Sequence, residues 1–137
     1  MRKLTVLVIH NQYQQPGGED VVVRAETEML CHAGHRVVPF IRSNTAIAEY
    51  TPLQKASLLV GTTWNQKAYK QLRELIANER PDIAHCHNLV PVISPAAYSA
   101  CASAGVPVVQ TLHNYRVLCP TGRCMVAARF ARSVGTA

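Results

Sequence analysis

The sequence predicts an α/β fold built on a doubly wound, mostly parallel sheet with helices on both faces. Several short segments are almost continuously apolar, which is typical of strands buried on both faces. Between them lie segments in which apolar residues recur at helical spacing. Strands that alternate with helices in this way form α/β sheets. The chain has 137 residues, 48% of them hydrophobic, which is enough for one domain with its own core.

The first strand, helix and second strand form a predicted βαβ unit. The apolar run "LTVLVI" over residues 4–9 is the first strand and belongs in the interior of the sheet. A helix follows over residues 19–33, with two acids in its first turn and Gly34 after its end. The residues expected to face the core are Val22, Ala25, Met29, Leu30 and Ala33. Residues 35–42 form the second strand, in which Pro39 indicates a bulge or a position near an edge.

A further helix is predicted where apolar residues again recur at helical spacing, at Ala68, Leu72, Leu75 and Ile76. Pro81 ends this helix, because a residue that precedes proline disfavours the helical conformation. The next strand, "DIAHCHN" over residues 82–88, is unusually polar at its end. Residues 43–63, which Pro52 interrupts, receive no assignment.

The last predicted helix and strand have clear boundaries. Ser94 is expected to be the N-cap of the helix, with Pro95 at its first position and Gly105 after its end. The apolar segment "VPVVQTL" over residues 106–112 then forms another buried strand.

The chain is basic, with a formal net charge of +6 and a pI of about 9.3. Its basic residues are spread along the sequence except near the end, where no acid follows Asp82 and the arginines are Arg116, Arg123, Arg129 and Arg132. This charge gives weak support for an anionic ligand or membrane surface. Nucleic-acid binding is not expected, because no segment interleaves aromatic and basic residues.

No apolar run approaches the roughly 20 residues that span a bilayer, and the first residues lack a secretory signal. We therefore expect a cytoplasmic protein, with peripheral contact at the inner face of the membrane as a further option. The five cysteines are an odd number and lie mostly in apolar segments, which favours a reducing compartment without a disulfide framework. Cys119 and Cys124 in "CPTGRC" are expected to be free thiols.

Histidine and asparagine collect where the predicted strands end. "HNQYQQPGGED" follows the first strand, "HCHN" ends the third, and "HNYRVLCP" follows the last. In parallel sheets the carboxyl ends of the strands meet at one edge, where ligands bind. His85 and His87 should lie on one face of their strand and Cys86 on the other. The sequence therefore predicts a polar rim at this edge.

The glycines in "PGGED" have two interpretations. Gly17 and Gly18 lack a Cβ, so backbone amides can approach an anion, and the following helix offers its positive end to a phosphate. Alternatively the segment is simply a turn. Dinucleotide binding is not expected, because G-x-G-x-x-G is absent and no acid ends the second strand.

A metal site is the weaker interpretation of the histidines. His85, His87 and His113, together with Cys86 or Cys119, offer enough donor types for zinc. However, Cys86 should point away from its neighbours and no C-x-x-C pair occurs, so we expect no metal. A histidine that hydrogen-bonds a sugar or phosphate is the alternative, and a structural role is expected first for His85, which lies deeper in its strand.

Taken together, "HNQYQQPGGEDVVV", "RPDIAHCHNLVPVISP" and "GVPVVQTLHNYRVLCP" resemble the N-terminal domain of a family 4 glycosyltransferase with the GT-B fold. The resemblance covers residues 1–120 in order and spacing. It implies a Rossmann-like domain that faces a second domain across a cleft, with the acceptor bound mainly here and the nucleotide-sugar donor mainly there. It also implies a retaining transferase that uses no bound metal or other cofactor.

The resemblance implies roles for individual residues on the donor side. His113 in "TLHNY" matches the cleft histidine that contacts the transferred sugar, which makes it the catalytic candidate. Gly17, Gly18 and Asn114 are then expected to bind the donor phosphate or sugar. His87, Asn88 and Glu19 are expected on the acceptor side, where the partner is a saccharide or a lipid-linked saccharide.

Residues 121–137, "TGRCMVAARFARSVGTA", depart from the family pattern and are expected to be an atypical basic tail left by truncation or a frameshift. The resemblance then implies that the donor-binding half is absent, that the chain alone is inactive, and that a C-terminal GT-B half could act in trans. The alternative interpretation is a non-catalytic domain that binds a saccharide acceptor at an anionic membrane surface.

Overall fold

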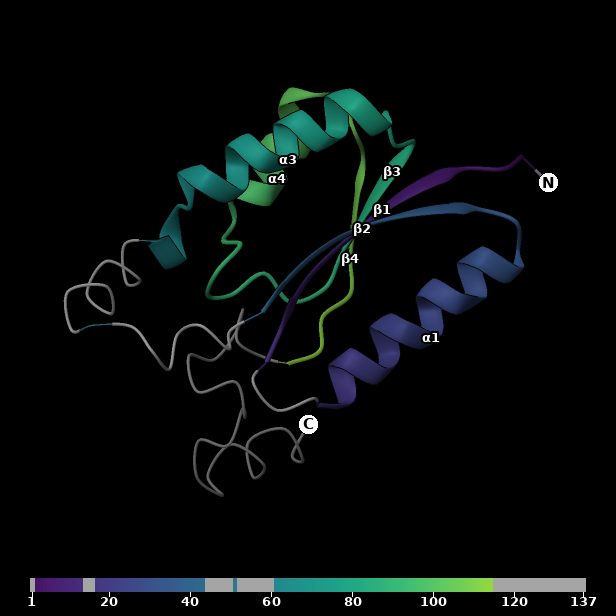
Figure 1. Cartoon of the computed structure of the whole chain (residues 1–137), viewed down its shortest axis with the longest axis horizontal. Coiled ribbons are helices and arrows are strands. Elements are labelled where there is room, and N and C mark those ends of the chain that lie inside the picture. Colours follow the sequence, from purple (N-terminus) through teal and green to yellow (C-terminus); the bar gives the residue numbers. More distant parts are fainter. Residues whose placement is uncertain (1, 14–16, 44–50, 52–60, 115–137) are drawn as a thin grey trace, which may run out of the picture.

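The computed structural model describes residues 2–13, 17–43, 51 and 61–114 (Figure 1). These residues form a parallel sheet of four strands in the order β2-β1-β3-β4. The strands are β1 (Thr5–Gln12), β2 (Arg36–Ser43), β3 (Ile83–Cys86) and β4 (Val108–Gln110). The predicted α/β class is confirmed.

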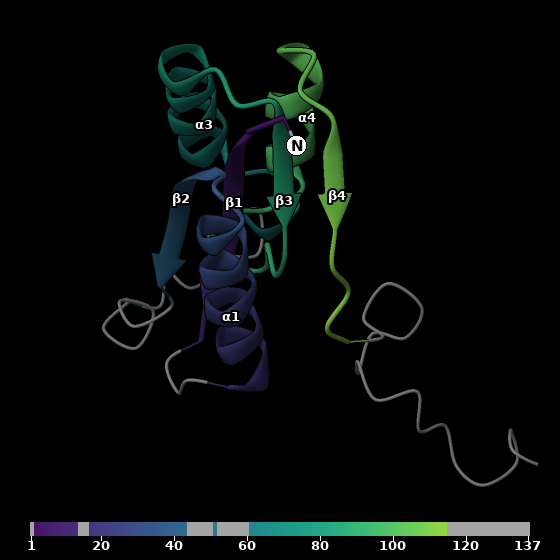
Figure 2. The same cartoon turned by 90° about the vertical axis from the view of Figure 1, so that its right-hand side faces the viewer.

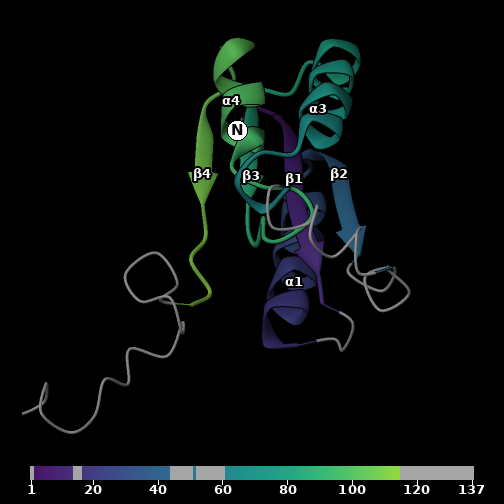
Figure 3. The same ribbon diagram turned by 90° about the vertical axis from the view of Figure 1, so that its left-hand side faces the viewer.

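Helices cover both faces of the sheet, as predicted. Helix α1 (Gly18–His32) lies on one face, and α3 (Gln66–Glu79) and α4 (Ala96–Ser103) lie side by side on the other (Figures 1 and 2). The four strands point the same way, so that their carboxyl ends share one edge of the sheet, at which α1 begins (Figures 2 and 3). This edge is the predicted rim.

Strand β1 lies inside the sheet, as predicted, because it pairs with β2 on one side and β3 on the other. Strand β2 lies at the edge of the described sheet. Pro39 stands opposite Val8 in a continuous register, so the edge position, rather than a bulge, accommodates the missing amide donor.

Alternating residues of the strands build two separate cores. The larger lies under α3 and α4 and contains Leu7, Ile9, Phe40, Cys86, Leu72 and Ile93, all buried. The smaller lies under α1, where Val23 packs on Val6 and Val8. Cys86 therefore faces away from the α1 side, as the strand pattern predicts.

The predicted buried face of α1 is wrong. Val22, Ala25 and Met29 are exposed, and Ala33 lies exposed at the C-cap. The helix instead buries Asp20 and Val23, with Leu30 half-buried against the smaller core. The physical reason is that this face of the sheet becomes polar toward its carboxyl end, so the helix places carboxylates rather than alkyl groups over it.

The helix ends follow the predicted signals. Gly34 and Gly105 have φ of 82° and 70° after α1 and α4, a left-handed conformation that glycine adopts without strain. Helix α3 ends at Glu79, and Arg80 is left-handed before Pro81. Helix α4 begins at Ala96, one residue later than predicted.

Ser94 nevertheless caps that helix, because its Oγ accepts a hydrogen bond from the Ala96 amide at 3.2 Å. The same oxygen accepts from the Asn65 amide at 2.8 Å. Asn65 is the N-cap of α3, so one buried hydroxyl joins the starts of both helices on this face.

Cys31, Cys86 and Cys101 are free thiols, in agreement with the predicted lack of disulfides among the described residues. Burial raises the pKa of Cys86 to about 12 and that of Cys101 to about 11, so both stay protonated. No helix in the described ranges is both long and apolar enough to cross a bilayer. The arginine-rich segment 121–137 and the thiols of Cys119 and Cys124 lie outside the described residues.

Leu72→Ala should lower the free energy of unfolding by about 2–5 kcal/mol, because Leu72 is fully buried between α3 and the sheet and its removal leaves a cavity. Glu74→Ala, on the exposed face of the same helix, is the control and should change it by less than about 0.5 kcal/mol. Urea unfolding followed by circular dichroism measures both. Equal effects of the two substitutions would contradict the packing of α3.

Candidate functional site

A cavity of about 250 Å³ opens at the carboxyl-end rim. The segments after β3 and β4 line it together with the first turn of α1. Among its lining residues are the predicted candidates Glu19, His87, Asn88, His113 and Asn114. Gly17 and Gly18 lie at the adjacent start of α1 and do not line the cavity. The rim therefore brings the predicted histidines and asparagines together.

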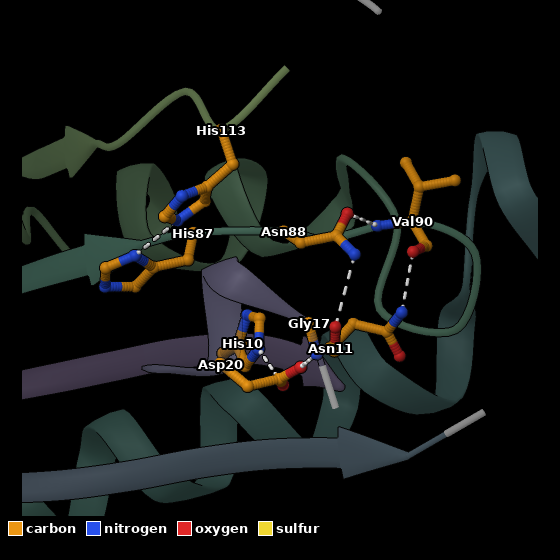
Figure 4. Close-up of polar contacts among 8 residues, drawn as sticks. All are labelled: His10, Asn11, Gly17, Asp20, His87, Asn88, Val90 and His113. Carbon is orange, nitrogen blue, oxygen red and sulfur yellow. Dashed lines mark hydrogen bonds and ion pairs between the residues drawn. The ribbon is translucent and has the colours of Figure 1, made fainter. Parts of the chain in front are cut away.

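His87 and His113 are in direct contact across the ends of β3 and β4 (Figure 4). His87 Nδ1 lies 3.0 Å from His113 Nε2, and the two rings stack with centroids 5.3 Å apart. Burial lowers the pKa of His87 to about 3, with a smaller contribution from the neighbouring histidines, so its imidazole is neutral at neutral pH. This bond engages Nε2 of His113 and does not involve its Nδ1.

Asn88 is buried, and both ends of its side chain bond the backbone. Its Nδ2 donates to the Asn11 carbonyl at 3.2 Å and its Oδ1 accepts from the Val90 amide at 3.2 Å. In return, Asn11 Nδ2 donates to the Val90 carbonyl at 2.6 Å (Figure 4). These bonds fix the loop after β3 against the end of β1. Asn88 therefore shapes the rim, and its contact with an acceptor stays a prediction.

Gln110 and Tyr98 are site residues that the sequence did not indicate. Gln110 Nε2 donates to the carbonyls of His87 at 2.6 Å and Thr111 at 2.8 Å, and Tyr98 Oη donates to Gln110 Oε1 at 2.7 Å. Both residues line the cavity. They hold the segment that carries His113 against β3. Only the position of Gln110, just before "TLHN", could have suggested this role.

Asp20 fixes the start of α1 to the sheet. Its Oδ1 accepts from His10 Nε2 at 3.0 Å and its Oδ2 from the Gly17 amide at 2.7 Å (Figure 4). Burial opposes ionisation of Asp20, but the Gly17 amide and His10 outweigh it and lower the pKa of this carboxyl. Since a carboxylate only accepts, His10 carries its proton on Nε2. The Gly17 amide is therefore already bonded, whereas the first-turn amides of Gly18 and Glu19 have no intrahelical acceptor.

Neither glycine of this loop is required by the fold of the described residues. Gly17 has a φ of −111°, which any residue adopts, and a Cβ there would come no closer than 4.0 Å to Asp20 Oδ2. A Cβ on Gly18 would meet nothing within 4 Å. The interpretation of "PGG" as a simple turn gains no support from this geometry.

Glu19 reaches into the cavity region with a buried oxygen, Oε2, that has no hydrogen-bond partner among the described residues. A buried carboxylate oxygen without a partner is costly unless a donor reaches it. Hydroxyl groups of a saccharide are such donors. Glu19 therefore fits a ligand that donates hydrogen bonds better than it fits a phosphate.

His85 and His87 lie on the α1 side of β3, with ring centroids 4.2 Å apart. Nε2 of each ring is 3.6 Å from Oε2 of Glu26 on α1. His85 Nε2 also hydrogen-bonds Thr111 Oγ1 at 2.8 Å, which gives it the structural partner that the sequence suggested. Glu26 was missed because it lies in a helix far from "HCH" along the chain. Cys86, on the opposite face, takes no part in this cluster.

The parallel sheet and its polar rim define an α/β domain, a class in which ligands generally bind at the carboxyl ends of the strands. The family model Glycosyltransferase Family 4 matches residues 16–133, which is most of the chain, and the protein belongs to that family as an N-terminal domain. Its substrates are thereby placed among sugars and their derivatives. Searches among curated proteins and among solved structures found no match.

Asp20→Asn should lower the free energy of unfolding at pH 7 by about 1–3 kcal/mol, because one amide oxygen cannot serve both His10 and Gly17. The folded pKa of Asp20 lies below its unfolded value, so its stabilisation is present above about pH 4 and is lost as the pH falls further. The difference between wild type and Asp20→Asn should therefore shrink on acidification.

Urea unfolding between pH 7 and pH 3 measures this difference. Glu28→Gln, on the exposed side of α1, is the matched control and should follow the wild type at every pH. A gap that stays constant or widens toward pH 3 would refute the assigned role of the Asp20 carboxylate.

Proposed function

We propose that this domain forms the acceptor side of a retaining glycosyl-transfer site, which moves a sugar from a nucleotide sugar to a saccharide or lipid-linked acceptor. The observation that carries the proposal is the cavity lined by His113, by its partner His87 and by Glu19, whose Oε2 has no hydrogen-bond partner in the described part of the chain. The proposal includes a donor-binding domain on the other side of the cleft, supplied in trans if necessary. The domain division at residue 120 and the cytoplasmic location remain part of the proposal.

His113 is the proposed catalytic residue. Its Nε2 is engaged by His87, which holds the ring in one orientation at the cavity, and Nδ1 is the nitrogen proposed to contact a ligand. A neutral imidazole can donate or accept a hydrogen bond at a sugar hydroxyl as charge develops between the sugar and the departing diphosphate. His87 acts here as a positioning residue, in addition to its proposed place on the acceptor side.

Gly18 is the stronger donor-side candidate of the two glycines. Its amide and that of Glu19 lie at the positive end of α1, where a diphosphate is stabilised. The amide of Gly17 is not available to the diphosphate, because it donates to Asp20. The proposed role of Gly17 is to leave room for the ligand, since it has no side chain. Asn114 lines the same cavity and is proposed to contact the donor sugar. The lack of any steric need for glycine at these positions supports close approach of a ligand.

A saccharide-binding domain without catalysis is the second candidate. It is favoured by the carboxylate of Glu19, which suits acceptor hydroxyls, and by the bond between the Gly17 amide and Asp20, which removes one phosphate donor. In this version the basic residues 121–137 would add contact with an anionic membrane. Acceptor binding that weakens with salt on anionic vesicles, without turnover, would select it.

His113→Ala should lower turnover by roughly 100- to 1,000-fold, the cost of removing one group that stabilises developing charge. Gly18→Val should also lower turnover, because the side chain blocks approach to the helix start, but it should leave stability unchanged. The measurement is release of nucleoside diphosphate from a panel of nucleotide sugars with saccharide and lipid-linked acceptors. The chain is assayed alone and with a family C-terminal half added in trans.

Gly105→Val is the matched control for the glycine substitution. With a φ of 70° at Gly105, this variant should lose about 1–3 kcal/mol of stability. Retention of the anomeric configuration in the product tests the retaining mechanism. Turnover that survives both His113→Ala and Gly18→Val would refute the proposed roles.

A further inference from the structure

Three potential ligand groups converge beside the rim, between α1 and β3. Glu26, His85 and His87 place one ligand atom each within 4.8 Å of the others. The His87 side chain is only 1% exposed, and its Nε2 has no hydrogen-bond partner among the described residues. Oε2 of Glu26 is likewise buried and accepts no hydrogen bond from the residues that the structure describes. Two atoms that normally need a partner thus lie 3.6 Å apart, slightly too far for a hydrogen bond.

We propose that these three side chains form a Zn²⁺ site. Zinc bonds to imidazole nitrogen and carboxylate oxygen at about 2.0–2.2 Å, so neighbouring ligand atoms of a tetrahedral site lie roughly 3.3–3.5 Å apart. The separations of 3.6 Å from Glu26 Oε2 to His85 Nε2 and to His87 Nε2 need only a slight contraction. Two imidazoles and one carboxylate are a zinc ligand set that leaves a fourth position open.

The surroundings of His87 also suit a metal ligand. A ligating histidine usually hydrogen-bonds through its other ring nitrogen, which fixes the ring. His87 Nδ1 makes such a bond with His113 Nε2 at 3.0 Å, and the second nitrogen points away from His113 (Figure 4). With zinc on Nε2, His87 would carry its proton on Nδ1 and donate to His113. Zinc would thereby fix which nitrogen of His113 accepts.

His85 must release Thr111 to bind the ion. Its Nε2 bonds Thr111 Oγ1 at 2.8 Å in the structure, so the threonine hydroxyl competes with zinc for the same nitrogen. The effect of this competition on zinc affinity distinguishes a zinc site from a cluster with a purely structural role. Removing the hydroxyl should strengthen metal binding, whereas it should have no such effect if His85 only holds Thr111.

Isothermal titration with ZnCl₂ tests the site in a background with Cys31, Cys119 and Cys124 replaced by serine, because thiolates bind zinc. In this background the protein with native Glu26, His85 and His87 should bind one Zn²⁺ per chain. Glu26→Gln should weaken binding by at least about 10- to 100-fold, the scale for loss of even an outer partner. His32→Asn, an exposed histidine of the same helix, is the matched control and should leave it unchanged. MgCl₂ should not bind, because Mg²⁺ prefers oxygen ligands.

Thr111→Val provides the test in the opposite direction and should tighten zinc binding about three- to tenfold, since one competing hydrogen bond is lost. A zinc-dependent rise in Tm, present in the wild type and reduced in Glu26→Gln, should accompany binding. Absence of binding, equal affinity in Glu26→Gln, or no gain in Thr111→Val would each overturn the site. None of these measurements uses glycosyl transfer, so the outcome is independent of the proposed activity.

Discussion

The burial of β1 is the constraint on which the other elements depend. This strand pairs on both sides, and helices cover both of its faces. Near its carboxyl end, His10 and Asn11 are polar and yet fully buried, so each needs partners inside the protein. Asp20 on α1 supplies one, and the backbone after β3 supplies others. The rim is therefore built onto the central strand rather than onto independent loops.

Side-chain bonds to the backbone tie the segments of the rim to one another and to the sheet. Asp20 holds the glycine loop, the Asn11 and Asn88 bonds hold the segment after β3, and Gln110 holds the segment after β4. The contact of His87 with His113 then joins the last two segments. A site held by buried bonds keeps its geometry better than one formed by exposed loops.

Local signals predicted the strands, the helix ends and the meeting of the histidines, because these follow from periodicity, from left-handed glycines such as Gly34, and from parallel strand direction. The buried face of α1 was predicted wrongly, since the sheet beneath it is polar at one end and attracts Asp20 and Glu26. Glu26 and Gln110 were not predicted as partners, because their contacts depend on how elements distant in sequence pack. The periodicity of apolar residues identifies a helix or strand, but it does not identify the residues against which that helix or strand packs.

The two pairs of glycines are under different physical constraints. Gly34 and Gly105 have left-handed backbones, in which a side chain would be strained. Gly17 and Gly18 are under no such requirement, since side chains would find room there. Side chains at positions 17 and 18 would change the surface at the start of α1 without disturbing the described fold. The shape and charge of this end of the helix can thus be varied independently of stability, whereas the ends of α1 and α4 cannot.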